Sequence, residues 1–237
     1  MVDGRLDAYR AAVERIFGEE LVSVTLYGGY ALDPPTEGGD VDVLIVVREL
    51  RRTALAAYRE AAPGFARQGI PPPPIFTEEF LARSLDAFPL EFLAMKEHRK
   101  VLSGRDVLAD VRVETTNLRH QVEFELKGKL LSLRRMYLAT HGARELAGLL
   151  RDTAGPIVCV ARGLLLLGGR EAPHGKAQIL SEIEARFGVA FPILREIVTA
   201  GDGKDLAGRV EEIAPGYLEE VERLCAAADE HAGGDIP

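Results

Sequence analysis

The run from Asp40 to Val47 constrains the fold most strongly, because two acidic residues open an otherwise unbroken β-branched and apolar stretch. Such a run is typical of a central strand. Alternate side chains of a strand share a face, so we expect Asp40 and Asp42 to point the same way, with backbones about 6–7 Å apart. The other face carries Val41, Val43, Ile45 and Val47, which can pack against a helix. One strand therefore has a core face and a chemical face.

Two adjacent glycines, Gly28 and Gly29, precede this acidic pair. The segment 21–26 alternates apolar and hydroxyl side chains, which predicts a strand that ends at these glycines. A glycine turn allows the backbone to approach a phosphate closely, and backbone N–H groups at a following short helix would favour an anion.

Two carboxylates on one strand face repel each other unless a cation lies between them. Mg²⁺ takes oxygen ligands and is commonly held by one or two carboxylates together with substrate phosphates. The alternative is an ordinary turn followed by a solvated strand end. Because buried carboxylates need partners, Asp40 and Asp42 at the start of so apolar a run favour the metal and phosphate interpretation.

The remaining segments of the first half predict a mixed α/β unit. Helical spacing is found over 5–17, 51–62 and 77–87, with Pro63 and Gly64 ending the second helix and Thr77 capping the third. The proline-rich segment 70–76 suits a loop or an edge strand. Residues 89–96 predict another strand, and 101–104 a short closing segment.

From about Thr115 the pattern becomes helical throughout. Apolar residues at helical spacing predict a long helix to about residue 139, followed by helices over 143–167, from 175, over 191–200 and over 215–230. We therefore expect an α+β chain with two domains, 1–112 and 113–237. A row of charged residues on the first of these helices favours an exposed, ion-paired face over a phosphate-facing one: Arg119, Glu123, Lys127 and Arg134.

Composition limits the class of protein. The 237 residues carry a net charge of −8, which disfavours a long nucleic-acid partner. Only two cysteines occur, so a disulfide framework is excluded. The longest apolar run is far shorter than a membrane span, and the N-terminus lacks the pattern of a signal peptide. We expect a soluble cytoplasmic protein.

The segment Leu26-Tyr27-Gly28-Gly29, followed after a spacer by Asp40-Val41-Asp42-Val43, resembles the signature of the nucleotidyltransferase superfamily. This superfamily has the DNA polymerase β fold and includes kanamycin and aminoglycoside nucleotidyltransferases. Gly29 and Gly39 stand where serine is frequent in the family, and no arginine follows Gly29. The resemblance implies a catalytic domain with a mixed sheet flanked by helices, and a C-terminal helical bundle that binds substrate.

The resemblance also implies roles for individual residues. Asp40 and Asp42 would hold Mg²⁺, and Gly28 and Gly29 would bind the nucleotide. Family members add a third acid, which serves as a metal ligand or a general base. Glu91 is the favoured candidate and Glu97 the rival. Lys176, at the predicted start of a late helix, resembles the lysine that grips the triphosphate in aminoglycoside adenylyltransferases.

The implied activity is transfer of a nucleoside monophosphate, with ATP as the expected donor, to an acceptor hydroxyl on a small molecule. Pyrophosphate would leave, and two Mg²⁺ ions would assist. The alternative is an antitoxin-like or regulatory protein of the same fold that modifies or binds a partner protein. The sequence leaves the acceptor, the base preference and a possible homodimer open.

Overall fold

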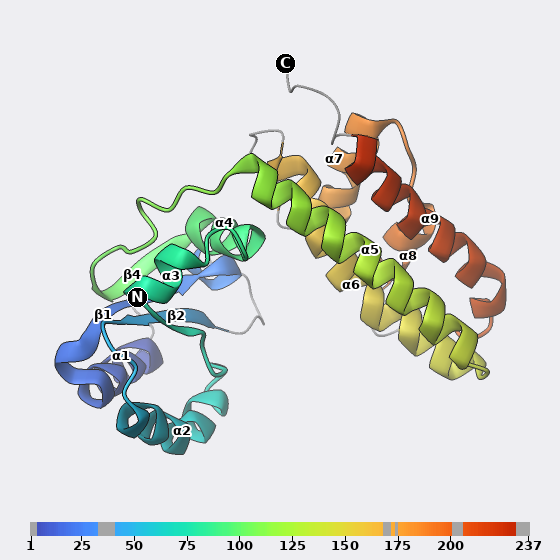
Figure 1. The fold of residues 1–237 in the computed structure, drawn as a ribbon. Coiled ribbons are helices and arrows are strands. Elements are labelled where there is room, and N and C mark those ends of the chain that lie inside the picture. The colour runs from blue at the N-terminus through green and yellow to red at the C-terminus, as the bar shows by residue number, and fades with distance from the viewer. Residues whose placement is uncertain (1–3, 33–40, 168–171, 174, 201–205, 231–237) are drawn as a thin grey trace. The chain divides into compact units, whose positions relative to one another are not determined.

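The computed structural model describes residues 4–32, 41–167, 172–173, 175–200 and 206–230. The chain forms two compact units, Met1–Glu114 and Thr115–Pro237, each of which is considered by itself (Figure 1). The first is a mixed α/β unit and the second is all helical, so the expected α+β fold is confirmed.

The N-terminal unit is built on a four-stranded mixed sheet in the order β3-β2-β1-β4. The central strand β1 pairs antiparallel with both β2 and β4, whereas the edge strand β3 pairs parallel with β2. The prolines at 71–74 lie directly before β3, which is at the edge of the sheet, in agreement with the expected loop or edge strand over 70–76. The strands are β1 Leu21–Tyr27, β2 Asp42–Val47, β3 Ile75–Thr77 and β4 Arg99–Gly104.

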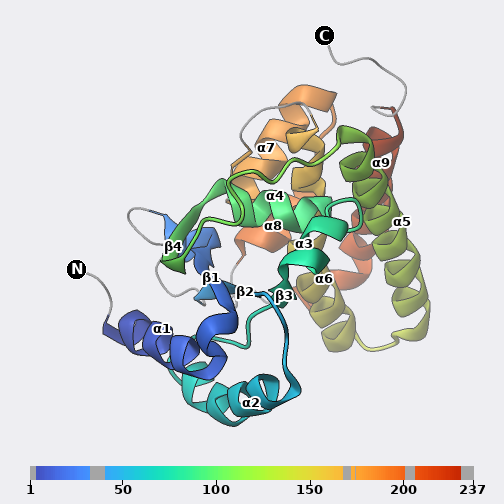
Figure 2. The ribbon, with the colours of Figure 1, turned by 60° about the vertical axis from the view of Figure 1, so that its left-hand side comes forward.

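Helices cover both faces of this sheet, as Figures 1 and 2 show. Helices α1 (Gly4–Phe17) and α2 (Arg52–Ala66) pack on the face that carries Val43 and Ile45, which confirms that this side of β2 is a core face. Helices α3 (Glu78–Arg83) and α4 (Pro89–Glu97) pack on the opposite face, against Leu44 and Val46. Two short 3-10 segments, η1 (Gly18–Glu20) and η2 (Gly28–Ala31), flank β1.

Three predictions in this unit are wrong, one of them the extent of the helix after Thr77, because α3 ends at Arg83 and not near residue 87. The segment 89–96 is helix α4 and not a strand. Phe92 and Met95, three residues apart, both face the core, and Pro89 occupies the first turn, where its missing N–H costs no hydrogen bond. Helix α2 continues past Pro63 to Ala66. Pro63 has no backbone N–H to donate, but its carbonyl still accepts a hydrogen bond from Arg67 N at 3.3 Å, so the last turn of the helix remains hydrogen-bonded.

The C-terminal unit is a bundle of helices whose apolar stripes meet in one core. The predicted helices are confirmed, although the last begins at Val210 rather than at 215. Tyr217 of that helix is fully buried, and its hydroxyl lies 2.9 Å from Thr153 Oγ1. The helices are α5 Thr115–Ala139, α6 Ala143–Leu166, α7 Lys176–Phe187, α8 Pro192–Thr199 and α9 Val210–Glu230.

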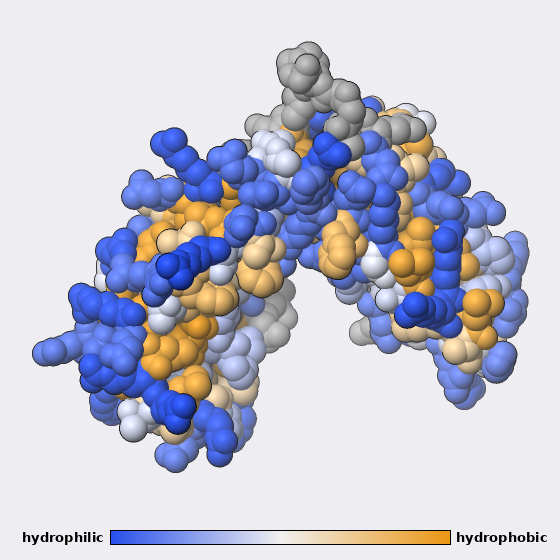
Figure 3. Space-filling view, in the orientation of Figure 1, coloured by the Kyte–Doolittle hydropathy of each residue, from blue (hydrophilic) through white to orange (hydrophobic). Residues whose placement is uncertain are grey.

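Glu123, Lys127 and Arg134 of the charged row on α5 form ion pairs. Lys127 lies 2.6 Å from Glu123 and 2.7 Å from Asp229 of α9, and Arg134 lies 3.0 Å from Glu222 of α9. These contacts bear out the predicted ion pairing for Glu123, Lys127 and Arg134. Figure 3 shows that hydrophilic residues are interrupted by apolar ones on the visible surface of this unit, and α5 leaves Phe124, Leu131 and Leu138 exposed. Among the helices that the structure describes, none combines the length and hydrophobicity needed to span a bilayer.

Candidate functional site

The glycine turn begins where β1 ends. Gly28 has a φ of +71°, in the left-handed region where a Cβ is unfavourable. Its N–H donates to the carbonyl of His98 at 3.0 Å, which ties the turn to the residue before β4. Gly28 and Gly29 then open η2, so the predicted turn and short helix are both present.

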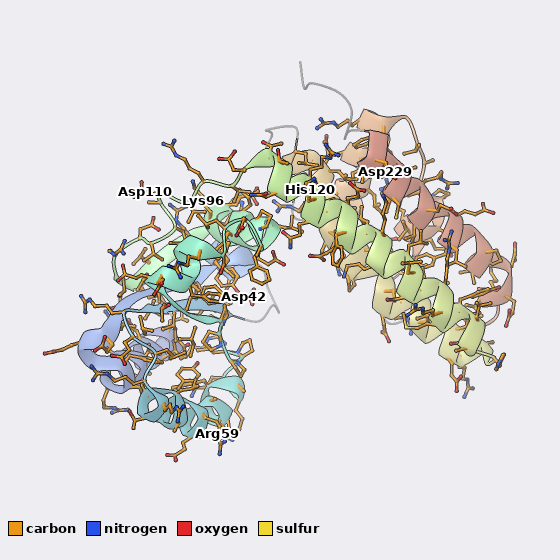
Figure 4. All side chains as sticks on the ribbon, viewed as in Figure 1. Asp42, Arg59, Lys96, Asp110, His120 and Asp229 are labelled. Atoms are coloured by element: carbon orange, nitrogen blue, oxygen red, sulfur yellow. The ribbon has the colours of Figure 1, made fainter. Side chains whose placement is uncertain are left out.

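Asp42 faces this turn. It is the first residue of β2, is half-buried and pairs in register with Tyr27 of β1. A Cβ added to Gly28 would lie only 3.2 Å from Asp42 Oδ2, so the carboxylate and the glycine backbone are immediate neighbours. Asp42 lies at the start of β2 (Figure 4), and by strand alternation it shares the face of Leu44 and Val46, on which α3 and α4 pack. The structure therefore brings together Gly28 and Asp42, two of the predicted site residues, whereas Asp40 lies outside the described residues.

The negative charge of Asp42 acts on Tyr27. Burial, and then the charge of Asp42, raise the pKa of the Tyr27 hydroxyl to about 12, so this group stays protonated at neutral pH. On the other side of β1, Arg99 is the register partner of Tyr27. Its guanidinium binds both carboxylate oxygens of Asp106 at 2.8–3.0 Å and thereby lowers the pKa of Asp106.

Both candidates for the third carboxylate, Glu91 and Glu97, are on helix α4, which packs against β1 and η2. Glu91 lies in the first turn of that helix and is exposed, whereas Glu97 is its last residue. Within the described part of the chain, no three His, Cys, Asp or Glu side chains are grouped closely enough to hold a metal ion. The described acids alone thus do not complete a three-ligand centre, and Asp40 is outside this comparison.

Lys176 is the first residue of α7, in the C-terminal unit. It is exposed, and its Nζ lies 2.9 Å from the position of a Cβ added to Gly155, so the ammonium covers that glycine of α6. The buried Arg162 donates to the carbonyls of Ala172 and Pro173 and so holds the chain shortly before α7. The prediction that Lys176 binds a triphosphate stays a prediction.

Comparison with protein families now gives the class of protein. The family model of the nucleotidyltransferase domain matches residues 6–130, which is more than half of the chain. The chain therefore belongs to the nucleotidyltransferase family. By this membership it is a nucleotidyltransferase enzyme.

Solved structures extend the likeness to both units. The chain is similar to the spectinomycin adenyltransferase AAD(9) from Enterococcus faecialis, whose structure contains ATP and spectinomycin. The match has a TM-score of 0.60 and 10% sequence identity, and covers 95% of this chain and 98% of that one. At this identity the likeness concerns the fold. Comparison with curated proteins gave no match.

Proposed function

We propose that the protein transfers a nucleoside monophosphate, AMP in the first instance, from a nucleoside triphosphate to a hydroxyl of a small molecule, with release of pyrophosphate. The observation that carries the proposal is the approach of Gly28 to Asp42, 3.2 Å from a Cβ position to the carboxylate, within a nucleotidyltransferase domain. A left-handed glycine beside a carboxylate leaves room for a phosphate next to the group that would hold its counterion.

The residues present fit Mg²⁺ because they offer hard oxygen donors beside an open glycine backbone. Asp42, together with Asp40 and Glu91, would hold the metal, which when bound would neutralise charge on the phosphates. The N–H groups of the turn at Gly28 and Gly29 would bind phosphate oxygens. As the acceptor oxygen forms a bond to the α-phosphorus, the bond from that phosphorus to the pyrophosphate oxygen breaks, and Glu91 takes the hydroxyl proton.

The acceptor is proposed to be a small, hydroxyl-bearing and cationic molecule. The structurally similar adenyltransferase is named for spectinomycin, a small molecule that it contains together with ATP. The net charge of −8 favours approach of a cation and disfavours a long nucleic acid. Lys176 is proposed to contact the triphosphate, so Lys176→Ala should raise KM for the nucleotide more than it lowers kcat.

The test measures pyrophosphate release by the full chain with Mg²⁺, each of the four nucleoside triphosphates, and a set of acceptors that includes spectinomycin. Asp42→Asn should lower the rate about 100-fold or more, since metal-assisted charge stabilisation contributes several kcal/mol. Asp110→Asn is the matched control, because Asp110 is an exposed acid of the same unit. Equal rates in the two variants would refute the role of Asp42.

Thermal melting with each nucleotide and Mg²⁺ addresses the regulatory alternative. A ligand that binds only the folded state raises the melting temperature. Stabilisation by a nucleotide, without release of pyrophosphate from that nucleotide in the presence of any acceptor, would contradict the proposed transfer and support a binding protein of this fold.

A further inference from the structure

One arginine contacts both a residue of the glycine turn and the segment Gln68–Gly69, which is hydrogen-bonded to Val41. Arg5, the second residue of α1, donates from Nη2 to the hydroxyl of Tyr30, in the turn that follows Gly28 and Gly29. The guanidinium carbon lies 5.1 Å from the centre of the Tyr30 ring, within the range of a cation–π contact. The glycine turn is thus held from the side of α1 through the side chain of Tyr30.

The same guanidinium also contacts the segment between α2 and β3. Nη1 of Arg5 donates to the carbonyl of Gln68 at 2.8 Å. The next residue, Gly69, has a φ of +75°, and its carbonyl accepts the N–H of Val41 at 2.9 Å. A Cβ at Gly69 would lie 3.4 Å from Arg5 Nη1, so this turn lies against the guanidinium.

Val41 is the residue between the two acids of the motif. Arg5 therefore connects, through Gln68 and Gly69, to the backbone that carries Asp42, and through Tyr30 to the turn that is proposed to bind phosphate. Along the chain, eleven peptide bonds separate Tyr30 from Val41, and the sheet already pairs Tyr27, just before the turn, with Asp42. One side chain thus adds, beside the strand pairing, a second link between the glycine turn and the backbone next to Asp42.

We infer that Arg5 is a positioning residue that fixes the glycine turn relative to Asp42, and so aligns the nucleotide phosphates with the carboxylates; this rests on the proposed function. Arginine suits the task because its planar guanidinium offers several donors in fixed directions. A lysine ammonium on its flexible stem would not hold Tyr30 and Gln68 together in the same geometry. Loss of Arg5 would misalign the reacting groups in the transition state, so the variant should have a lower kcat.

The test compares Arg5→Ala, Arg5→Lys and Tyr30→Phe with the control Arg15→Ala, an exposed arginine of the same helix. At a temperature well below the melting point of each variant, Arg5→Ala should lower kcat about 10- to 100-fold, in line with the cost of small misplacements at a reacting centre. KM for the acceptor should change little. Arg5→Lys should not restore the rate, and Tyr30→Phe, which removes only the hydroxyl partner, should lower it less.

Because Arg5 and Tyr30 act as a unit, combining Arg5→Ala with Tyr30→Phe should cost less than the product of the two single losses. Hydrogen exchange provides a reading that needs no substrate. Arg5→Ala should accelerate exchange in the segment 28–32 and at the Val41 amide, whereas Arg15→Ala should leave both unchanged.

The failures can be told apart. A wild-type chain that transfers no nucleotide would refute the proposed function, and hydrogen exchange would still show whether Arg5 fixes the two segments. Unchanged kcat in Arg5→Ala beside an active wild type, with only a lower melting temperature, would refute the inference and leave the proposed function standing.

Discussion

Replacing Gly28 with alanine separates backbone strain from crowding at the site. The φ of +71° places the new residue in the left-handed region, which costs an L-residue roughly 1–2 kcal/mol. For the N-terminal unit, Met1–Glu114, each 1 kcal/mol lowers the melting temperature by roughly 4 °C. The added Cβ would also lie 3.2 Å from Asp42 Oδ2, closer than ordinary van der Waals contact, so the carboxylate has to shift by a few tenths of an ångström.

Gly18→Ala is the matched control for this variant. Gly18 belongs to the same unit and has a φ of +53°, but a Cβ added there would meet nothing within 4 Å. Both variants should lose similar stability in thermal melting, whereas only Gly28→Ala should lose tenfold or more in kcat/KM for nucleotide transfer, which corresponds to about 1.4 kcal/mol of transition-state stabilisation. Equal activity in two equally destabilised variants would refute the proposed closeness of phosphate, turn and carboxylate.

Two further predictions concern stability. Buried Glu220 accepts hydrogen bonds from the N–H groups of Ile193 and Leu194 at 2.9 and 2.7 Å and so caps α8. Glu220→Ala should lower the free energy of unfolding by about 2–3 kcal/mol in urea titration. The control Glu219→Ala, at an exposed position, should change it little. Because the pKa of Tyr27 is raised to about 12, unfolding releases a proton between pH 10 and 12, and the free energy of unfolding falls with rising pH in this range. Tyr27→Phe should reduce this fall, measured as free energies of unfolding at pH 9 and 11.5. An unchanged pH dependence would contradict the raised pKa of Tyr27.

Local sequence signals predicted the core of the site. The β-branched run after Asp40 and the alternating run before Gly28 became β2 and β1. A short β-branched apolar run suits a central strand, and the alternating run has the two-residue period of a strand. The same signals placed Gly28 at a turn, where the structure has a positive φ. These features depend on residues close in sequence, so they can be read without the fold.

Contacts between distant residues could not be predicted in this way. Arg5 lies 25 residues from Tyr30 and 63 from Gln68, and Glu220 lies 27 residues from Ile193. No periodicity links such pairs, since their partners are set by how α1 and α9 pack. Arg5 was therefore not predicted from the sequence, because an arginine at the start of an amphipathic helix gives no signal beyond its position.

The error over 89–96 changes how the third carboxylate has to be tested. Glu91 lies in the first turn of α4, where an acidic side chain has an ordinary structural use, because it interacts favourably with the helix dipole. That use is worth about 0.3–1 kcal/mol at an exposed position. Stability and activity therefore give separate answers for this residue.

Glu91→Gln should change the melting temperature only slightly but lower kcat about 10²- to 10⁴-fold, as expected for loss of a general base. Glu97→Gln is the comparison, since Glu97 ends the same helix and precedes His98, whose carbonyl accepts the N–H of Gly28. The measurement is pyrophosphate release across pH 5–9 for both variants, with melting curves as the control for folding. If Glu97→Gln loses the activity and Glu91→Gln keeps it, the base lies at the end of α4 that adjoins the glycine turn, and Glu91 serves only to begin the helix.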